Sequence, residues 1–296
     1  MSAISQRIEP RQQDIGFVVR RLLPVRGMRS VGPFVFLDHM GPAYFVAAGT
    51  AGDVRPHPHI GLATVTYLLK GKLHHRDSLG TDRWIEPGEV NLMTAGQGIT
   101  HSERTDGEIR NHPHGLLGLQ SWVALPKSAE DSPAAFHHSG KAELPMLEGE
   151  GKQVRLIMGH GWGARAPVPT ASETIYADAI LAAGASLPLP DDHEDRGVYV
   201  LSGEVSVGGQ SFGPGQMLIF RPGDRISVKA GESGARVMVL GGATMDGPRF
   251  IWWNFVASSQ ARIDAAKEAW RAGDWAHGRF RLPPADDAEF IPAPEK

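Results

Sequence analysis

Cysteine is absent from this chain of 296 residues. Without cysteine the protein has no disulfide bond, no thiolate zinc site, no iron–sulfur cluster and no cysteine nucleophile. Neither charge sign dominates, because 30 Lys and Arg stand against 33 Asp and Glu, and the net charge of −3 shows no basic excess. A basic excess is the usual footprint of nucleic-acid binding, so we expect no direct nucleic-acid partner. Any metal must be held by nitrogen and oxygen ligands, for which 13 histidines are present.

Long apolar runs are also missing. The longest stretches without Asp, Glu, Lys or Arg have 16 residues, at 111–126 and 205–220. Both are shorter than the roughly 18 apolar residues that a spanning helix needs. The N-terminal residues MSAISQRIEPRQQDI lack the apolar core of a signal peptide. We therefore expect no membrane association and a cytoplasmic location.

Glycine and proline are abundant, at 36 and 22 residues, and they separate short apolar runs of strand length. Examples are the runs 63–69 and 90–94, and runs of this kind recur about every ten residues, as in sandwiches and barrels. The polar stretch 127–152 is typical of a crossing between two β halves. The sequence therefore predicts an all-β protein with domains at 1–135 and 136–296.

One segment breaks the β pattern. Residues 258–273 begin with serines that suit an N-cap and end with a glycine that suits a helix stop. One face of this predicted helix carries apolar residues at spacings of three and four, namely Ile263, Ala266 and Trp270. We expect an amphipathic helix that packs against one of the β halves.

A weak internal repeat is visible in the sequence. Residues 193–227 follow the plan of 57–101, with a histidine, a strand, a glycine turn, a Pro-Gly turn and an apolar strand. Such duplication predicts two similar barrels in tandem. The second copy has Ser227 near the place where the first has His101. We therefore expect no metal site in the second barrel.

The first candidate metal motif is Arg55-Pro-His-Pro-His59. Two histidines at i and i+2 in an extended chain point to the same face, so His57 and His59 can reach one ion. The intervening prolines favour extended backbone at their neighbours. By itself a His-x-His pair is more often a surface or turn feature.

The second candidate motif contains His101 and Glu103, which have the same i, i+2 spacing after a glycine-rich lead. Together the two motifs offer three imidazoles and one carboxylate, which leaves two coordination positions open and suits Fe(II). Mn, Ni, Cu or Zn could take the same ligands. The alternative is that His101 and Glu103 form only a hydrogen-bonded pair at a barrel mouth. By contrast, His74, His75 and Asp77 lie beside a hairpin turn and are expected to be solvated turn residues.

The motifs resemble those of the pirin family, which consists of bicupins with two β-barrel domains. The matching stretches are SVGPFVFLDHMGPA, RPHPHIGLATVTYLLKG, HRDSLG, PGEVNLMTAGQGITHSE and GPRFIWWNFVASS, within residues 15–275. The resemblance implies that the N-terminal barrel binds one metal, usually iron, through His57, His59, His101 and Glu103. One departure is Ala63, where pirins and many cupins carry a glutamate. That change is expected to alter the polarity around the metal.

The resemblance also implies a function, quercetin 2,3-dioxygenase activity. In such an enzyme a flavonol hydroxyl binds at the iron and loses its proton to a base, for which Glu103 is the candidate. Dioxygen then opens the ring and carbon monoxide is released. The alternative implied by the family is a non-enzymatic, redox-sensitive iron protein that binds a transcription factor or a metabolic enzyme. A third interpretation is a cupin that acts on an unrelated small molecule.

Overall fold

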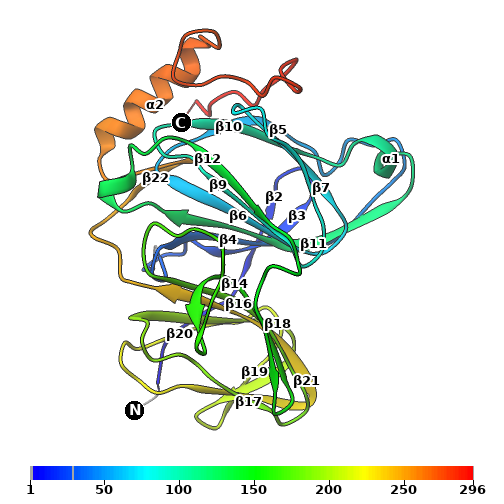
Figure 1. Cartoon of the computed structure of the whole chain (residues 1–296), viewed down its shortest axis with the longest axis vertical. Helices are drawn as coiled ribbons and strands as arrows, with labels where there is room; N and C mark the ends of the chain where they lie inside the picture. The colour runs from blue at the N-terminus through cyan, green and yellow to red at the C-terminus, as the bar shows by residue number, and fades with distance from the viewer. Residues whose placement is uncertain (1–2, 29, 296) are drawn as a thin grey trace. The chain divides into compact units, whose positions relative to one another are not determined.

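The computed structural model describes residues 3–28 and 30–295, which form two compact units (Figure 1). Unit 1 contains the described parts of 1–12, 20–37 and 139–245, and unit 2 those of 13–19, 38–138 and 246–296. The central passage from one unit to the other lies between His138 and Ser139, close to the predicted boundary at 135/136. The predicted division into 1–135 and 136–296 treats each domain as one continuous segment. In the structure, the N-terminal residues 3–12 belong to unit 1, and the C-terminal residues 246–295 belong to unit 2. An N-terminal strand completes the sheet of unit 1, whereas the C-terminal helix packs in unit 2.

Unit 1 is built on one antiparallel sheet of ten strands, with the main order β1-β20-β18-β21-β16-β14-β13. Alternate residues along each strand point inward, and the residues that do so are apolar and form one cluster. The strands are β1 (Ile4–Ile8), β13 (Met146–Gly149), β14 (Lys152–Gly161), β15 (Ala164–Arg165), β16 (Thr174–Leu181), β17 (Ser186–Pro188), β18 (Asp195–Val207), β19 (Gln210–Phe212), β20 (Met217–Phe220) and β21 (Ser227–Gly242).

Unit 2 contains a four-stranded sheet, β5-β10-β7-β8, and most of a seven-stranded sheet, β12-β9-β6-β11-β4-β3-β2. The smaller sheet consists of β5 (Val54–His59), β7 (Leu73–Asp77), β8 (Asp82–Ile85) and β10 (Ile99–Arg104). The larger consists of β2 (Arg11–Asp14), β3 (Val18–Leu23), β4 (Phe34–Phe45), β6 (Leu62–Lys70), β9 (Val90–Thr94), β11 (His114–Ala124) and β12 (Ala135–Ser139). The predicted all-β architecture is confirmed, although the sheets form jelly rolls and do not close into continuous barrels.

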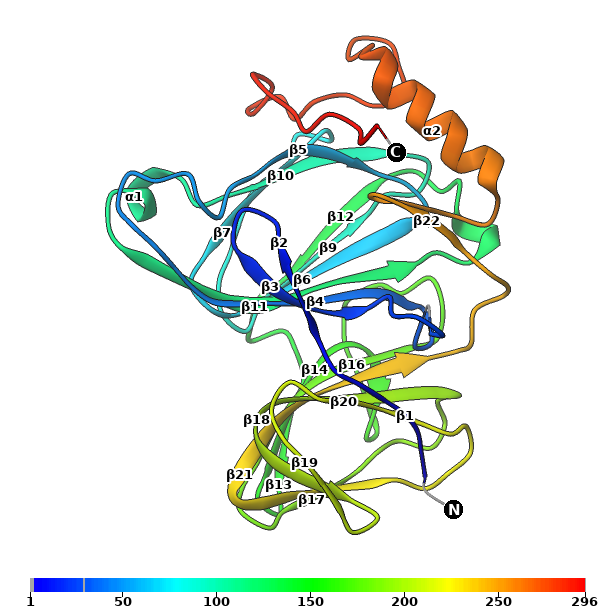
Figure 2. The ribbon, with the colours of Figure 1, turned by 180° about the vertical axis from the view of Figure 1, so that it is seen from behind.

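The predicted C-terminal helix forms as α2 (Gln260–Ala272) and ends at Gly273 in the left-handed conformation. Its buried face is the predicted one, with Ile263, Ala266 and Trp270 in an apolar cluster beside β22 (Phe250–Trp252) and β23 (Phe255–Ala257). Figures 1 and 2 show α2 and the segment after it on the same side of unit 2 as β5 and β10.

The remaining short helices are α1 (Gly107–Arg110) and a 3-10 turn at Lys127–Ala129. In the described part of the chain, no helix combines the length and the apolar character that crossing a bilayer requires.

Candidate metal centre

Three of the predicted ligands meet on the interior face of the four-stranded sheet. Strand β10 pairs with β5 so that His101 lies directly opposite His57, and Ile99 lies opposite His59. Because side chains alternate along a strand, the three imidazoles share one face. They are almost fully buried, and their ligand nitrogens all lie within 4.8 Å of one another. The i, i+2 spacing thus leads to the convergence that the sequence predicted for the histidines.

Backbone carbonyls fix the orientation of two of these imidazoles. The Nδ1 atom of His57 is 2.8 Å from the carbonyl oxygen of Arg55, and that of His59 is 3.1 Å from the carbonyl oxygen of Asn254. A carbonyl only accepts hydrogen bonds, so each Nδ1 carries the hydrogen and each Nε2 keeps its lone pair. This is the tautomer that a metal ligand needs.

The spacing between ligand nitrogens fits a shared ion. The Nε2 atoms of His59 and His101 are 3.2 Å apart. This separation is short enough for both nitrogens to bind one ion at ordinary metal–nitrogen bond lengths of about 2.0–2.1 Å. The donor set of this chain therefore suits a divalent transition metal held by nitrogen ligands.

Burial also favours the neutral form of the three histidines. It lowers the pKa of His57 to about 4 and lowers the pKa values of His59 and His101 well below their usual range. For His59 and His101, the neighbouring imidazole of His57 is the next largest cause. At neutral pH these ligands therefore need not lose a proton before they bind a cation.

The fourth predicted ligand, Glu103, lies beside this group and not within it. Its carboxylate is not among the atoms that close within 4.8 Å, although it follows His101 on the same face of β10. Its Oε1 is 3.3 Å from the hydroxyl of Thr66, on β6, and that hydroxyl is also 2.9 Å from Oε1 of Gln120. Burial is the largest cause of a raised Glu103 pKa. The carboxylate is thus a buried group poised next to the three imidazoles.

The prediction that His74, His75 and Asp77 are solvated turn residues was wrong: all three are buried, and His75 and Asp77 are part of this interior. Their exposed fractions are 4% and 0%. They lie on β7, which pairs with β10 so that His75 is opposite Glu103 and Asp77 is opposite His101. An i, i+2 pair on a strand was the available signal, but the turn composition around it suggested solvent exposure.

The comparisons with known proteins agree with this geometry. The Pirin family profile matches residues 16–123, and the profile of the Pirin C-terminal cupin domain matches residues 176–276. A pirin-like protein of Caulobacter vibrioides is 48% identical over 290 residues, which cover 97% of this chain and 98% of the relative. The chain belongs to the pirin family. The two matched segments confirm the predicted bicupin.

Two further relatives of this pirin carry the name of an activity. A Pseudomonas aeruginosa protein named as a candidate quercetin 2,3-dioxygenase is 40% identical over 279 residues, covering 93% of this chain and 86% of the relative. A crystal structure of quercetin 2,3-dioxygenase from Acinetobacter baumannii superposes with a TM-score of 0.88 at 32% identity. That match covers 98% of this chain and 94% of the other.

The departure of this pirin from the family pattern, Ala63, lies on the far face of its strand. Thr66 faces Glu103 across the interior of unit 2, and β6 pairs regularly with β9 and β11 from residue 63 to residue 66. Alternation therefore directs Thr64 to the interior and Ala63 away from it. The missing glutamate removes no group from the face that contacts Glu103.

A second histidine cluster lies in unit 1, where we expected no metal site. Ligand atoms of His160, Glu173 and His193 lie within 4.8 Å of one another. The His193 ring is engaged at both nitrogens, with Nδ1 2.8 Å from Glu173 and Nε2 2.9 Å from the carbonyl oxygen of His160. These are ordinary hydrogen-bond lengths, and hydrogen bonds account for the cluster. The absence of a metal from this unit stays a prediction.

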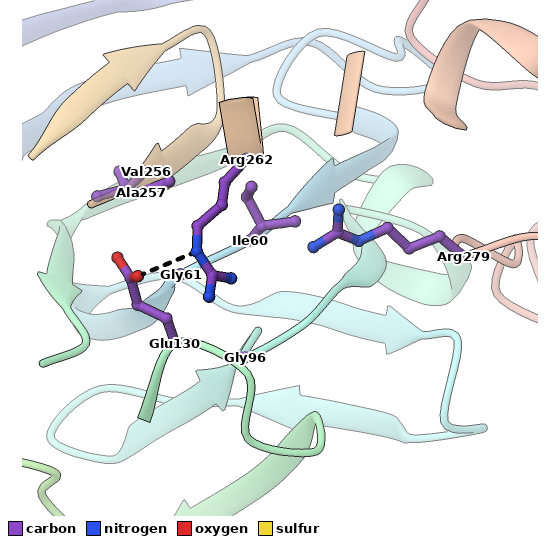
Figure 3. A pocket seen from close by; sticks show the side chains of 8 residues that line it. All are labelled: Ile60, Gly61, Gly96, Glu130, Val256, Ala257, Arg262 and Arg279. Atoms are coloured by element: carbon purple, nitrogen blue, oxygen red, sulfur yellow. Dashed lines mark ion pairs between the residues drawn. The ribbon is translucent and has the colours of Figure 1, made fainter. Parts of the chain in front are cut away.

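A recess next to the metal motif is separate from the centre itself (Figure 3). It is lined by Ile60 and Gly61, which follow His59, and by the side chains of Arg262 and Arg279. Figure 3 shows Arg262 beside Glu130, whose carboxylate is 3.6 Å from the guanidinium. None of the three histidines lines this recess.

Proposed function

We propose that this pirin is a metal-dependent quercetin 2,3-dioxygenase, which cleaves a flavonol ring with dioxygen and releases carbon monoxide. The observation that carries the proposal is the convergence of three neutral imidazoles, His57, His59 and His101, two of them fixed by backbone carbonyls. The names of the similar proteins support the substrate class, a small aromatic molecule.

We propose His57, His59, His101 and Glu103 as the metal ligands. Fe(II) is the ion that we favour, and Mn, Ni, Cu and Zn suit the same nitrogen and oxygen donors. When bound, a redox-active divalent ion supplies a Lewis acid and a path for electrons to dioxygen.

Glu103 has a second proposed role as the base that accepts the proton of the flavonol hydroxyl. Its carboxylate lies next to the imidazoles but outside the group that closes within 4.8 Å, so it has room to contact a substrate. The Thr66 hydroxyl lies within hydrogen-bond distance of Oε1 and limits its movement. A positioned base of this kind contributes about 10²–10⁴-fold to a rate.

The exposure of the site residues indicates the side from which a substrate approaches. His57 and Glu103 are 7% and 8% exposed, whereas His59 and His101 are 1% exposed. The indole of Trp122 meets the His59 ring edge-on at 5.3 Å and covers the inner side. We therefore propose that the substrate approaches from the side on which His57 and Glu103 lie.

The test begins with metal analysis of the purified protein, followed by anaerobic loading with Fe(II) and addition of quercetin and dioxygen. We expect one molecule of carbon monoxide and one depside for each quercetin consumed. A protein that holds iron but consumes no quercetin would contradict the proposal. In that case, metal-dependent capture of a partner protein would support the alternative of a redox-sensitive regulator.

A further inference from the structure

A row of three buried side chains leads from the metal centre to a turn at the edge of unit 2. It starts at His101 on β10 and passes to His75 and Asp77 on the neighbouring strand β7. The Nδ1 atoms of His101 and His75 are 3.4 Å apart, and Nε2 of His75 is 3.1 Å from Oδ2 of Asp77. The His75 ring is stacked on Phe136, with ring centroids 4.7 Å apart.

We infer that Asp77, acting through His75, positions the proposed metal ligand His101 and sets which of its nitrogens carries the hydrogen. The inference deepens the proposed function, on which its relevance to the metal rests. His57 and His59 each have a backbone carbonyl as acceptor for Nδ1, whereas Nδ1 of His101 contacts another imidazole, that of His75. An imidazole can accept or donate, so this orientation depends on what lies behind it.

The donor and acceptor roles follow from the carboxylate at the end of the row. A carboxylate oxygen accepts hydrogen bonds, so the Nε2 atom of His75, 3.1 Å from Oδ2 of Asp77, carries the hydrogen. With the hydrogen on Nε2, the Nδ1 atom of His75 is the nitrogen left to accept the N–H of His101 Nδ1. His101 is left with a lone pair on Nε2, the atom that faces Nε2 of His59 at 3.2 Å.

Asp77 also has a structural role, which the experiment must separate from this one. Its other oxygen, Oδ1, accepts the backbone N–H groups of Leu79 and Thr81 at 2.9 and 3.1 Å. An asparagine at this position keeps an oxygen for the turn but presents an N–H group to His75. The tautomer of His75 then inverts, and His101 must place its hydrogen on Nε2, where it blocks the metal.

The same strand provides a matched control on its other face. His74 lies between the carboxylates of Asp106 and Asp82, at 2.9 and 2.5 Å, and its ring stacks on Trp84. Asp82 is therefore a histidine-bound carboxylate of the same sheet whose side chain is half exposed. Asp82→Asn makes the same chemical change as Asp77→Asn without touching the row that ends at His101.

The first experiment measures the Zn²⁺ affinity of the metal-free full-length protein by competition with a chelator. We expect Asp77→Asn to weaken binding about 10- to 100-fold, the range typical of residues that support a metal ligand. Asp82→Asn is expected to bind within twofold of the unchanged protein. The thermal midpoints of both metal-free variants should stay within a few degrees of the original. Wild-type affinity in Asp77→Asn would overturn the inference.

The second experiment changes the middle residue of the row. In His75→Asn the side-chain oxygen lies near the place of Nδ1 and can accept the His101 N–H, whereas His75→Leu offers no acceptor. We expect His75→Asn to retain zinc affinity within a few-fold and His75→Leu to lose tenfold or more. Equal losses in the two variants would reduce His75 to a packing residue and contradict the inference.

A third measurement does not depend on metal binding. Nitrogen-15 NMR of the metal-free protein, with the His101 signal assigned by its loss in His101→Ala, reports which ring nitrogen carries the hydrogen. We expect hydrogen on Nδ1 in the unchanged protein and on Nε2 in Asp77→Asn. Hydrogen on Nε2 in the unchanged protein overturns the inference. If the protein binds no metal, the proposed function fails while this measurement still decides the role of the row.

Discussion

The buried histidines of this protein differ in the atoms that their two ring nitrogens contact. The backbone carbonyls of Arg55 and Asn254 occupy Nδ1 of His57 and His59 and leave Nε2 available. In His193 both nitrogens contact oxygen atoms, so neither is open to a metal while those contacts persist. At the residue scale, the hydrogen-bond partners distinguish a histidine that can bind a metal from one whose two nitrogens are both engaged in hydrogen bonds.

This contrast predicts the metal content of two alanine variants. His101→Ala removes one of three converging ligands and should lower bound iron several-fold. His193→Ala changes a hydrogen-bonded cluster in the other unit and should leave bound iron unchanged. Elemental analysis of the two proteins purified in parallel provides the measurement. Equal iron loss in both would show that the assignment of one metal centre is wrong.

A second prediction at this scale concerns Glu103. Glu103→Gln keeps the shape of the side chain and an oxygen toward Thr66 but removes the proton acceptor. We expect kcat for flavonol cleavage to fall at least 100-fold, as for loss of a general base, while iron retention changes only a few-fold. Glu86→Gln, at an exposed carboxylate paired with Lys72, is the control. Comparable losses of iron and activity in Glu103→Gln would make Glu103 only a ligand.

At the scale of elements, the segment between His59 of the proposed metal centre and β6 lies close to β23. Gly61 lies between His59 and the start of β6, has φ of +64°, and would place a Cβ atom 2.0 Å from the carbonyl oxygen of Val256. The backbone N–H of Val256 also donates to the carbonyl oxygen of Ile60. Glycine is therefore required where the C-terminal segment contacts the backbone next to a ligand.

The substitution Gly61→Ala tests this contact. An alanine here would be strained in the left-handed conformation, and its Cβ atom would clash with the carbonyl oxygen of Val256. Because the two effects add, we expect a loss of roughly 2–4 kcal/mol in unfolding free energy. Gly80→Ala is the matched control, because φ there is +88° but nothing lies within 4 Å of the added Cβ. It should cost only about 1 kcal/mol. Urea unfolding measures both, and equal losses would show that the approach of β23 is unimportant.

At the scale of the whole molecule, the two units differ in the polarity of the side chains that they bury. The interior of unit 1 is a continuous set of apolar side chains, whereas unit 2 buries the imidazoles of His57, His59, His75 and His101 and the carboxyl groups of Asp77 and Glu103. Burying such groups costs free energy unless they are paired or bind an ion. The metal-free protein should therefore be more sensitive to acid than an apolar jelly roll.

We predict that the metal-free protein loses stability as the pH falls from about 6.5 to about 4. The folded-state pKa of His57 is about 4 against 6.5 when exposed, so protons bind the unfolded chain more strongly within this window. His57 alone contributes roughly 3 kcal/mol, fully present above pH 6.5 and lost on acidification. His59 and His101 act in the same direction, and Glu103 acts in the opposite one because its pKa is raised.

The measurement is urea unfolding of the metal-free protein between pH 4 and pH 7.5. In parallel, the triple variant with His57, His59 and His101 replaced by asparagine should show a much flatter profile over this range. A flat profile in the unchanged protein would contradict the burial of three neutral histidines.

The sequence by itself determined the features that depend on local periodicity. The i, i+2 spacing of His57 and His59, the helix over 258–273 and the all-β class follow from strand alternation, helix periodicity and turn residues, which act over a few positions. The two histidine-containing halves of the proposed metal site could be recognised for the same reason, because each half occupies one short strand.

The tertiary structure decided everything that depends on partners distant in the chain. The carbonyl that orients His59 belongs to Asn254, 195 residues away, and the imidazole facing His101 belongs to His75, 26 residues away. The local sequence pattern predicted a solvated turn for His75 and Asp77, because it contains no information about β10, the strand that pairs with theirs. Side-chain alternation is a local property of the backbone, whereas burial and hydrogen-bond partners are set only when distant strands pair.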